Sequence, residues 1–429
     1  MVEAGAFLHA SKEIRGVSRL LGRMARKAVM SRLECLKEGR LTVRENGDTH
    51  VFGSGDTPSA NVTVRDENFF RALAFGGHVG VVDAFVDGFW KVDDLTSLIR
   101  IFLRNREVLD GLETGWARLV QPARFIMHTL NRNTRRGSKS NIIAHYDLGN
   151  EFFSQFLDET MTYSCGVFER PGSSMAEASI EKYDRLCRKL ALTEDDHVIE
   201  IGTGWGGFAI HAASRYGCRV TTTTVSDQQY LLASERISAA GLDNRVTLLC
   251  CDYRDLTGTF DKLVSIEMIE AVGHQYYGLF FEQAAKLLEP HGLAAIQAIT
   301  IQDRYYEAAR RETDFIKRYI FPGSCIPALS ILMAAMALTD LRLVHLEDIT
   351  PHYAETLRRW RERFLTNWPA IEALGHDEGF RRLWQFYFSY CEGGFAESIL
   401  GDVQLIFAKP QAPGSLLIAG EANQEWAIA

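Results

Sequence analysis

The sequence contains no hydrophobic run long enough to cross a bilayer, which takes about 18 or more uninterrupted apolar residues. Its longest apolar stretch, residues 326–338, falls short of that length. The N-terminus also lacks the apolar core and the small-residue cleavage site of a secretory signal peptide. We therefore expect neither a transmembrane helix nor secretion.

Cysteine is present without a pattern, since the eight cysteines are scattered and no CxxC pair occurs. This argues against a disulfide framework or a zinc site and favours a reducing cytoplasm. Glu267, Glu270 and His274 are close in sequence, but their spacing is not HExxH and no third ligand is evident. We expect no bound metal.

An excess of positive charge is also absent, because the formal net charge is -8. Free nucleic acid is therefore not an expected partner. Basic residues nevertheless gather between residues 12 and 32, and again at Arg132, Arg135, Arg136 and Lys139. Such clusters suit either an anionic lipid surface or ordinary solvated faces and linkers, and both interpretations stay open.

The 429 residues exceed the usual span of one hydrophobic core, so the length predicts two domains. An amphipathic helix at 12–33, short strands between 40 and 66, and helical patterns to about 129 predict a small α+β domain over 1–130. The polar, basic segment 131–140 is a candidate linker.

From about residue 175, strands and helices alternate, which predicts a doubly wound parallel sheet in a second domain at 141–410. Residues 302–400 look mainly helical and interrupt this rhythm, 404–408 return as a last strand, and 411–429 form a loose tail. The expected strands are 197–201, 218–224, 245–250, 262–266 and 293–299, and the expected helices are 176–191, 206–215, 228–240 and 276–288.

A glycine-rich turn follows the first of these strands, with Gly202, Gly204 and Gly206 after the acidic Glu200. Glycines let a backbone approach a ligand closely, and the next helix presents free N–H groups there. A nicotinamide site would want an acid about 20 residues after the first glycine, whereas residues 221–226 contain none. The pattern E-x-G-x-G-x-G instead resembles motif I of the S-adenosylmethionine-dependent methyltransferases.

Six more segments, in order, resemble the cyclopropane-fatty-acyl-phospholipid synthases within that class. The resemblance covers about 140–408, and the N-terminal part matches only through Gly88-Phe89-Trp90. It implies an α/β, class I methyltransferase, Rossmann-like seven-stranded sheet, with a helical insertion at about 302–400 over an acyl pocket and a small lipid-associated N-terminal α+β domain. Apolar residues of 326–338 would line the pocket or belong to ordinary core. The segments are 145–153, 161–165, 224–229, 267–274, 319–323 and 352–357.

The resemblance implies methyl transfer from S-adenosylmethionine to the cis double bond of a phospholipid's unsaturated acyl chain. An alkene is a weak nucleophile, so the site must be dry and pre-aligned, and the resulting carbocation needs negative charge or aromatic faces nearby. A bound bicarbonate ion then takes a proton from the new methyl group and the cyclopropane ring closes. Membrane-surface action and a homodimer are further implications of the resemblance.

Residue by residue, the resemblance assigns Cys165, Glu270, the backbone of Ile299 and Tyr353 to the anion site, with Cys391 as a second cysteine near it. Tyr163 and Ser164 would belong to a lid over the methyl donor, and Asp252 would recognise its adenine. The donor-binding residues implied are Tyr146, Tyr163, Ser164, Glu200, Gly202, Gly204, Gly206, Thr224, Gln229 and Asp252.

Gln297 departs from the pattern, because many family members carry histidine there. Its amide can donate a hydrogen bond to an anion but cannot carry a proton. This puts the product in doubt, so a C-methyltransferase that leaves a methylene or methyl branch stays open beside the cyclopropane synthase. A lipid-binding protein without activity and a nicotinamide oxidoreductase are less favoured alternatives.

Overall fold

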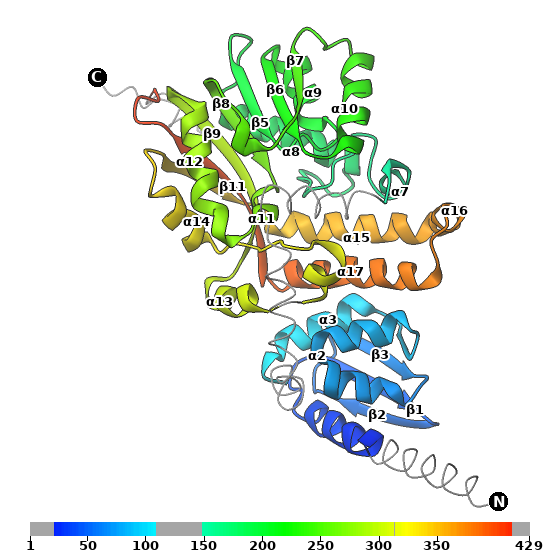
Figure 1. Cartoon of the computed structure of the whole chain (residues 1–429). Helices are drawn as coiled ribbons and strands as arrows, with labels where there is room; N and C mark the ends of the chain where they lie inside the picture. Colours follow the sequence, from blue (N-terminus) through cyan, green and yellow to red (C-terminus); the bar gives the residue numbers. More distant parts are fainter. Residues whose placement is uncertain (1–20, 109–147, 313, 414–429) are drawn as a thin grey trace, which may run out of the picture. The chain divides into compact units, whose positions relative to one another are not determined.

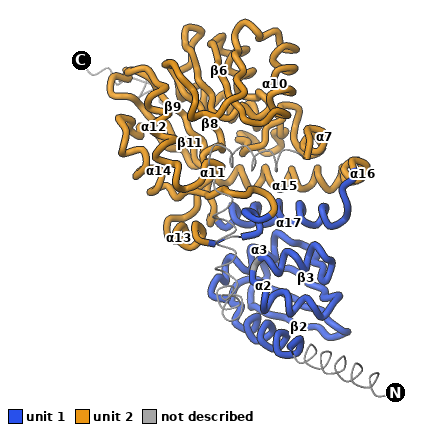
Figure 2. Tube along the Cα trace, in the orientation of Figure 1, with its two compact units in different colours: residues 1–127, 312–318, 375–397 blue, residues 128–311, 319–374, 398–429 orange. Residues whose placement is uncertain are grey.

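The computed structural model describes residues 21–108, 148–312 and 314–413. The chain forms two compact units: unit 1 is Met1–Met127, Glu312–Arg318 and Gly375–Glu397, and unit 2 is the remainder (Figure 2). The expected insertion at 302–400 is thus divided between the units. The linker 131–140, its basic cluster, residues 1–20 and most of the tail lie outside the described residues, while 21–33 are helical.

Unit 1 contains a four-stranded sheet in the order β2-β1-β3-β4. The strands β1 (Arg40–Glu45), β2 (Asp48–Phe52) and β3 (Ser59–Val64) agree with the sequence prediction, whereas β4 (Trp90–Val92) was not foreseen. Trp90 is almost fully buried and packs on Phe85 of helix α2 (Asn68–Val86). Burial of this one large side chain fixes a strand too short to show a period of its own.

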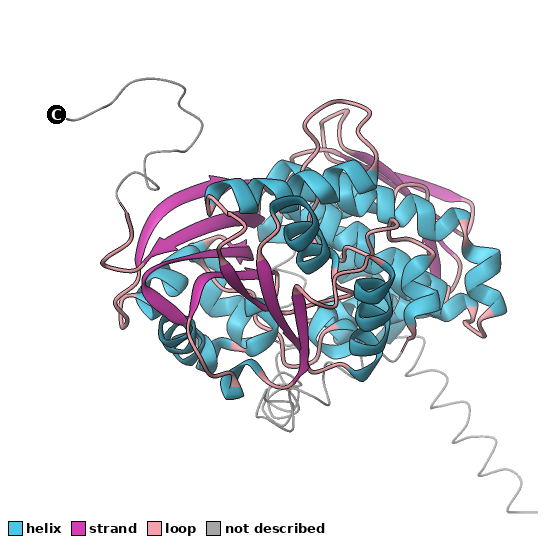
Figure 3. Cartoon of the chain, turned by 90° about the horizontal axis from the view of Figure 1, so that it is seen from above, coloured by secondary structure: helices cyan, strands magenta, loops and turns pink. Residues whose placement is uncertain are grey.

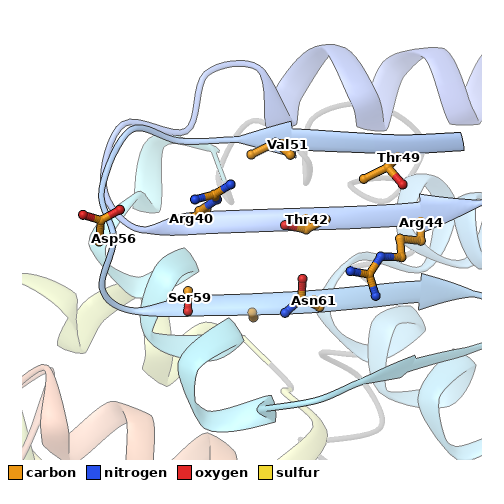
Figure 4. A pocket seen from close by; sticks show the side chains of 9 residues that line it. Arg40, Thr42, Arg44, Thr49, Val51, Asp56, Ser59 and Asn61 are labelled. Carbon is orange, nitrogen blue, oxygen red and sulfur yellow. The ribbon is translucent and has the colours of Figure 1, made fainter.

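Side chains alternate across β1, so Leu41 and Val43 enter the core while Arg40, Thr42 and Arg44 face outward. The outward side chains line an open hollow on the sheet (Figure 4). It is completed by Thr49, Val51, Asp56, Ser59, Ala60 and Asn61.

Helix α17 (Glu378–Ala396) belongs to unit 1 because it packs on α3 (Leu95–Arg104). The Thr96 hydroxyl donates to Glu392 at 3.2 Å, and the Arg100 guanidinium donates to Glu397 at 2.7 Å. Helix α3 itself begins at Asp94, whose carboxylate accepts the Ser97 N–H at 3.0 Å, as a helix N-cap should.

Unit 2 is built on a seven-stranded sheet in the order β10-β11-β9-β8-β5-β6-β7 (Figure 1). The class I methyltransferase architecture expected from the sequence is confirmed. The segment 302–400 is not wholly helical, because β10 pairs antiparallel with β11 at the sheet edge. All residues of β10 are exposed or part-exposed, so their hydrophobic pattern is weak. The strands are β5 (His197–Ile201), β6 (Arg219–Thr224), β7 (Val246–Cys250), β8 (Phe260–Ile266), β9 (Leu288–Ile301), β10 (Arg342–Asp348) and β11 (Leu400–Ala408).

The helices of unit 2 cover both faces of this sheet (Figure 3). The four helices expected from the sequence begin and end within a few residues of the prediction, as α8 (Met175–Lys189), α9 (Gly207–Tyr216), α10 (Asp227–Ala239) and α12 (Tyr277–Leu287). The other helices are α7 (Asn150–Ser154), α11 (Ile269–Val272), α13 (Asp303–Arg311), α14 (Leu329–Met336), α15 (Thr350–Thr366) and α16 (Trp368–Ala373), with short helical segments η1 (Tyr253–Asp255) and η2 (His274–Tyr276). The segment η3 (Ile316–Ile320) contains residues of both units.

Two cores result from the strand alternation. Ile199 and Ile201 of β5 pack with α12 on one face, while Val198 packs with α8 and α9 on the other. Within the expected pocket-lining stretch, Leu332 is fully buried in the α12 core, and Leu338 is 75% exposed. Leu332 thus follows the ordinary-core interpretation. Across the parts of the chain that the structure describes, no helix has the length and apolar character to cross a membrane.

Candidate active site

The glycine-rich turn joins β5 to α9 at the carboxyl edge of the parallel strands, where ligands of doubly wound sheets bind. Gly202, Gly204 and Gly206 have φ of 102°, 53° and 85°, conformations that glycine adopts without strain. The N–H groups of Gly202 and Thr203 donate to the Thr223 carbonyl of β6 at 3.1 and 3.0 Å. The turn is therefore held against the neighbouring strand.

Glu200 lies beneath this turn, 2% exposed, and its carboxylate accepts the Thr222 hydroxyl at 2.6 Å. Thr222 in turn contacts the Thr203 hydroxyl at 2.6 Å, which links the acid to the turn. Burial raises the pKa of Glu200 to about 8, against the opposing effects of the Thr222 hydrogen bond and the positive charge of Lys182.

Replacing Glu200 by glutamine is expected to change how the stability of the ligand-free protein depends on pH. The folded-state pKa exceeds the ordinary value of 4.5, so the native state binds more protons between pH 4.5 and about 8. Wild type should lose up to about 1.4 kcal/mol of stability per pH unit across that window from this group, and the neutral variant should not. Denaturant unfolding at pH 5, 7 and 9 measures the difference. Parallel pH profiles would contradict it, and the exposed Glu282→Gln serves as the control.

The other expected donor-binding residues lie around the same edge. The Thr224 hydroxyl donates to the Gln229 side-chain oxygen at 2.8 Å, which orders the start of α10. Asp252 follows β7 and accepts from the Arg254 backbone at 3.0 Å and from its guanidinium at 2.8 Å. Tyr146 lies outside the described residues. Their roles toward a donor stay predictions.

Tyr163 lies in an aromatic cluster, with ring centroids 5.2 Å from Trp360 and 5.3 Å from Phe153. Phe153 also packs on Trp205 of the glycine-rich turn, at 5.2 Å. These rings come from four separate segments and bury apolar surface beside the turn. Aromatic faces of this kind exclude water and attract positive charge.

Three of the predicted anion-site residues converge on one carboxylate, that of Glu267. Its Oε1 accepts the Cys165 backbone N–H at 2.8 Å and the Gln297 side-chain amide at 2.8 Å, and its Oε2 accepts the Tyr353 hydroxyl at 2.5 Å. Glu267 directly follows β8, so it too stands at the carboxyl edge of the sheet.

Glu270, on α11, accepts the Ile299 N–H through Oε1, so this backbone group binds a side chain of the protein, and its predicted role toward an anion stays a prediction. Its Oε2 is buried with no hydrogen-bond partner among the described residues. Burial, and then the negative charge of Glu267, raise the pKa of Glu270 to about 8.

Asp402 and Gln404 on β11 join this hydrogen-bonded group, the Glu267 cluster, through the side chain of Gln297. The Gln297 amide donates to Asp402 at 3.0 Å, and the Gln404 amide donates to the Gln297 oxygen at 3.0 Å. Asp402 is fully buried, and this burial raises its pKa well above the ordinary range, with the charges of Glu267 and Glu270 adding to the effect.

A fully buried cation, Lys182 of α8, lies near these carboxyl groups. Its ammonium donates to the Ser164 hydroxyl at 2.6 Å and sits 4.4 Å from the Tyr183 ring centroid. Burial lowers the pKa of Lys182, while the negative charge of Glu267 works in the opposite direction. Ser164 thus joins the lysine to Cys165, the next residue in the chain.

Cys391 lies on α17, in unit 1, whereas Glu267 belongs to unit 2. Its proposed place near the anion stays a prediction. Sequence reasoning missed Lys182, Glu267 and Asp402 as members of the site. Two of these residues had a visible feature: Lys182 is a charged residue in an amphipathic helix, and Glu267 is an acid at the end of a buried strand. A single sequence does not show that the two lie close together in space.

The expected bicarbonate does not fit this arrangement. The Cys165 N–H, the Gln297 amide and the Tyr353 hydroxyl all donate to Glu267, and the Ile299 N–H donates to Glu270. The donors assigned to a bound anion are therefore already engaged by carboxylates of the chain. Over the described residues, no group of three or more His, Cys, Asp or Glu side chains is arranged to hold a metal ion.

Comparison with known proteins supports the sequence resemblance. A family model described as mycolic acid cyclopropane synthetase matches residues 133–405. The chain is 36% identical over 375 residues to the tuberculostearic acid methyltransferase of Mycobacterium tuberculosis, covering 85% of this chain and 87% of the relative. It is 32% identical over 368 residues to the cyclopropane-fatty-acyl-phospholipid synthase of Escherichia coli, covering 83% and 89%.

A solved mycolic acid cyclopropane synthase, complexed with S-adenosylhomocysteine and CTAB, matches the fold with a TM-score of 0.59 at 28% identity. The match covers 63% of this chain and 98% of that structure. The glycine-rich turn, the seven-stranded sheet and these matches agree, so the chain belongs to the cyclopropane synthase family of S-adenosylmethionine-dependent lipid methyltransferases.

Proposed function

We propose that the protein transfers a methyl group to the cis double bond of an unsaturated acyl chain in a phospholipid. The observation that carries the proposal is the convergence of Cys165, Gln297 and Tyr353 on the part-buried carboxylate of Glu267 at the carboxyl edge of the sheet. The printed names of two relatives, a tuberculostearic acid methyltransferase and a cyclopropane-fatty-acyl-phospholipid synthase, support an acyl chain as the acceptor.

S-adenosylmethionine supplies the methyl group when it is bound. The residues that would hold it are those of the glycine-rich turn, with Thr224, Gln229 and Asp252 at the adjoining strand ends. The aromatic cluster of Tyr163 and Trp360 would exclude water from the reacting double bond and favour the positive charge that develops on the acyl chain. The carboxylate cluster would accept the proton that must leave.

The product we propose is a cyclopropane ring, with a methylene branch as the alternative; a saturated methyl branch would need a separate reductant to add hydride to the methylene compound. After methyl transfer the acyl chain carries a carbocation. If a C–H bond of the new methyl group breaks at once, its electron pair closes the ring. If a hydride shifts first, the same C–H electron pair forms an exocyclic double bond. Both routes release one proton, so the Gln297 network is compatible with either. We carry no bound bicarbonate into these steps, because its donors are engaged by the chain.

The deciding experiment is gas chromatography–mass spectrometry of fatty acids after incubating the protein with S-adenosylmethionine and vesicles of a cis-unsaturated phospholipid. A product heavier by one CH2 that no longer adds reagents across a double bond supports ring formation. A product of the same mass that still adds them identifies the methylene compound. Unchanged acyl chains would overturn the proposed acceptor.

Gly202→Ala is expected to weaken S-adenosylmethionine binding by about tenfold or more, because φ of 102° disfavours a side chain and the new methyl group would meet Met268 at 3.3 Å. Isothermal titration measures the loss. The matched control is Gly241→Ala, which has φ of 68° but open space and lies at the end of α10. Equal affinity in both variants would contradict the role of the turn.

Action at the membrane surface, a cytoplasmic location and a homodimer remain parts of the proposal. Vesicle co-sedimentation with anionic and neutral lipids tests the first, and light scattering of the purified protein tests the last. The helical residues 21–33 carry basic side chains, which supports attraction to an anionic surface.

A further inference from the structure

Glu267 occupies the position at which the anion-site donors meet. We propose that its carboxylate is the built-in base of the reaction, so that the protein accepts the proton itself and needs no bicarbonate. This inference rests on the proposed acyl-chain methylation and specifies how that reaction ends.

The contacts of Glu267 are those that a bound anion would need. Donors from three distant segments reach it: the Cys165 N–H at 2.8 Å, the Gln297 amide at 2.8 Å and the Tyr353 hydroxyl at 2.5 Å. Three hydrogen bonds to one carboxylate in a water-poor interior are strong and directional. They fix the charge at one place, as an acceptor of a defined proton requires.

The backbone of Glu267 supports a functional reason for this side chain. Its φ is 47°, in the left-handed region, and its N–H donates to the Gln297 carbonyl at 2.9 Å. A non-glycine residue there costs about 1–2 kcal/mol, which glycine would avoid. Strain held by its surroundings in this way is typical of functional sites.

The groups around Glu267 act on one another electrostatically. Burial raises the pKa of Asp402 well above its usual range and that of Glu270 to about 8, and the negative charge of Glu267 adds to both shifts. Burial also raises the pKa of Glu267, but the Lys182 charge and the hydrogen bonds from Tyr353, Cys165 and Gln297 oppose that rise. Lys182 and the three hydrogen-bond donors therefore all favour the charged form of the Glu267 carboxylate.

Once the acyl chain carries the new methyl group and a carbocation, a methyl C–H bond breaks and the proton moves to an oxygen of Glu267. The electron pair of that bond forms the third ring bond, or the exocyclic double bond after a hydride shift. The proton then leaves the neutral Glu267 carboxyl for water, directly or through the Tyr353 hydroxyl, before the next turnover.

The first test measures turnover of the full-length wild type on cis-unsaturated phospholipid vesicles, in buffer stripped of carbon dioxide and in buffer with added bicarbonate. Equal product in both is expected. Product that appears only with bicarbonate would overturn the inference and leave the proposed function intact. No product in either buffer would overturn both.

The second test uses two variants and their binding of S-adenosylmethionine as a readout of folding. Glu267→Gln is expected to lower turnover about a hundredfold or more while its affinity for S-adenosylmethionine stays unchanged. Glu267→Gly suits the left-handed backbone and leaves the three hydrogen-bond donors without their carboxylate. Added formate or bicarbonate is therefore expected to bind them and to raise the turnover of this variant about tenfold or more. A purely structural role of Glu267 would not permit such a rescue.

The matched control is Glu45→Gln, which changes another buried glutamate, 5% exposed, in unit 1. Its turnover should equal that of wild type and should not change when formate or bicarbonate is added. Turnover of Glu267→Gln within about threefold of wild type would refute the assignment, since a general base contributes a hundredfold or more. The assignment would also be refuted if the Glu267→Gly protein binds S-adenosylmethionine but neither formate nor bicarbonate raises its turnover.

Discussion

The Tyr353→Phe protein is expected to bind S-adenosylmethionine as wild type does and to form product about a hundredfold more slowly. Tyr353 is 6% exposed on α15, and its hydroxyl donates to Glu267 Oε2 at 2.5 Å. Phenylalanine fills the same space but removes that donor. The part-buried Glu267 carboxylate then loses a hydrogen bond that orients it and stabilises its charge. Single-turnover product formation and isothermal titration measure the two quantities.

Two further proteins sharpen this test. Glu270→Gln should also slow turnover while sparing donor affinity, because Glu270 holds the Ile299 N–H and faces the same cluster. Tyr216→Phe removes a hydroxyl that donates to Asp184 at 2.9 Å on the far side of α8, and it should leave turnover unchanged. If the Tyr353→Phe protein turns over as fast as wild type, the Tyr353 hydroxyl has no role in the reaction.

The parallel part of the fold could be predicted because its strands and helices carry their own periods. Strand β5 was expected at 197–201 and lies at His197–Ile201, and α9 was expected at 206–215 and lies at Gly207–Tyr216. The short β4 and the edge strand β10 were not foreseen. Their pairing depends on a partner strand, and β10 buries too little for a clear pattern.

The site could be predicted only where a residue matched a family motif. Cys165, Gln297 and Tyr353 meet in the structure, and Ile299 contacts Glu270, so four positions predicted from motifs far apart in sequence are brought together in pairs or groups. Glu267 was noted only as the first residue of the family-like segment 267–274 and in a metal site that the spacing argued against. Its importance lies in what donates to it, and hydrogen bonds between residues 86 or 102 positions apart are not visible in a sequence.

Lys182→Met is expected to destabilise the protein by about 3–5 kcal/mol, the usual effect of removing one partner from a set of buried charges. Lys182 is fully buried, and the negative charges of Glu267, Asp402 and Asp158 favour its charged form, although burial lowers its pKa. Methionine has a similar length and suits the apolar part of the cavity, so the loss reports the missing charge rather than missing volume. Urea denaturation at pH 7 gives the change in the free energy of unfolding.

The double variant Lys182→Met/Glu267→Gln decides what that charge is for. If the lysine balances an ionised Glu267, removing both charges leaves a neutral site, and the double variant should be more stable than Lys182→Met alone. The control is Lys262→Met, since Lys262 is also buried but lies 3.9 Å from Asp196. The changes in the free energy of unfolding caused by Lys262→Met and by Glu267→Gln should add in the corresponding double variant. Additive effects for Lys182 as well would mean that the negative charge resides on another carboxyl group, and the base would then have to be sought at Asp402 or Glu270.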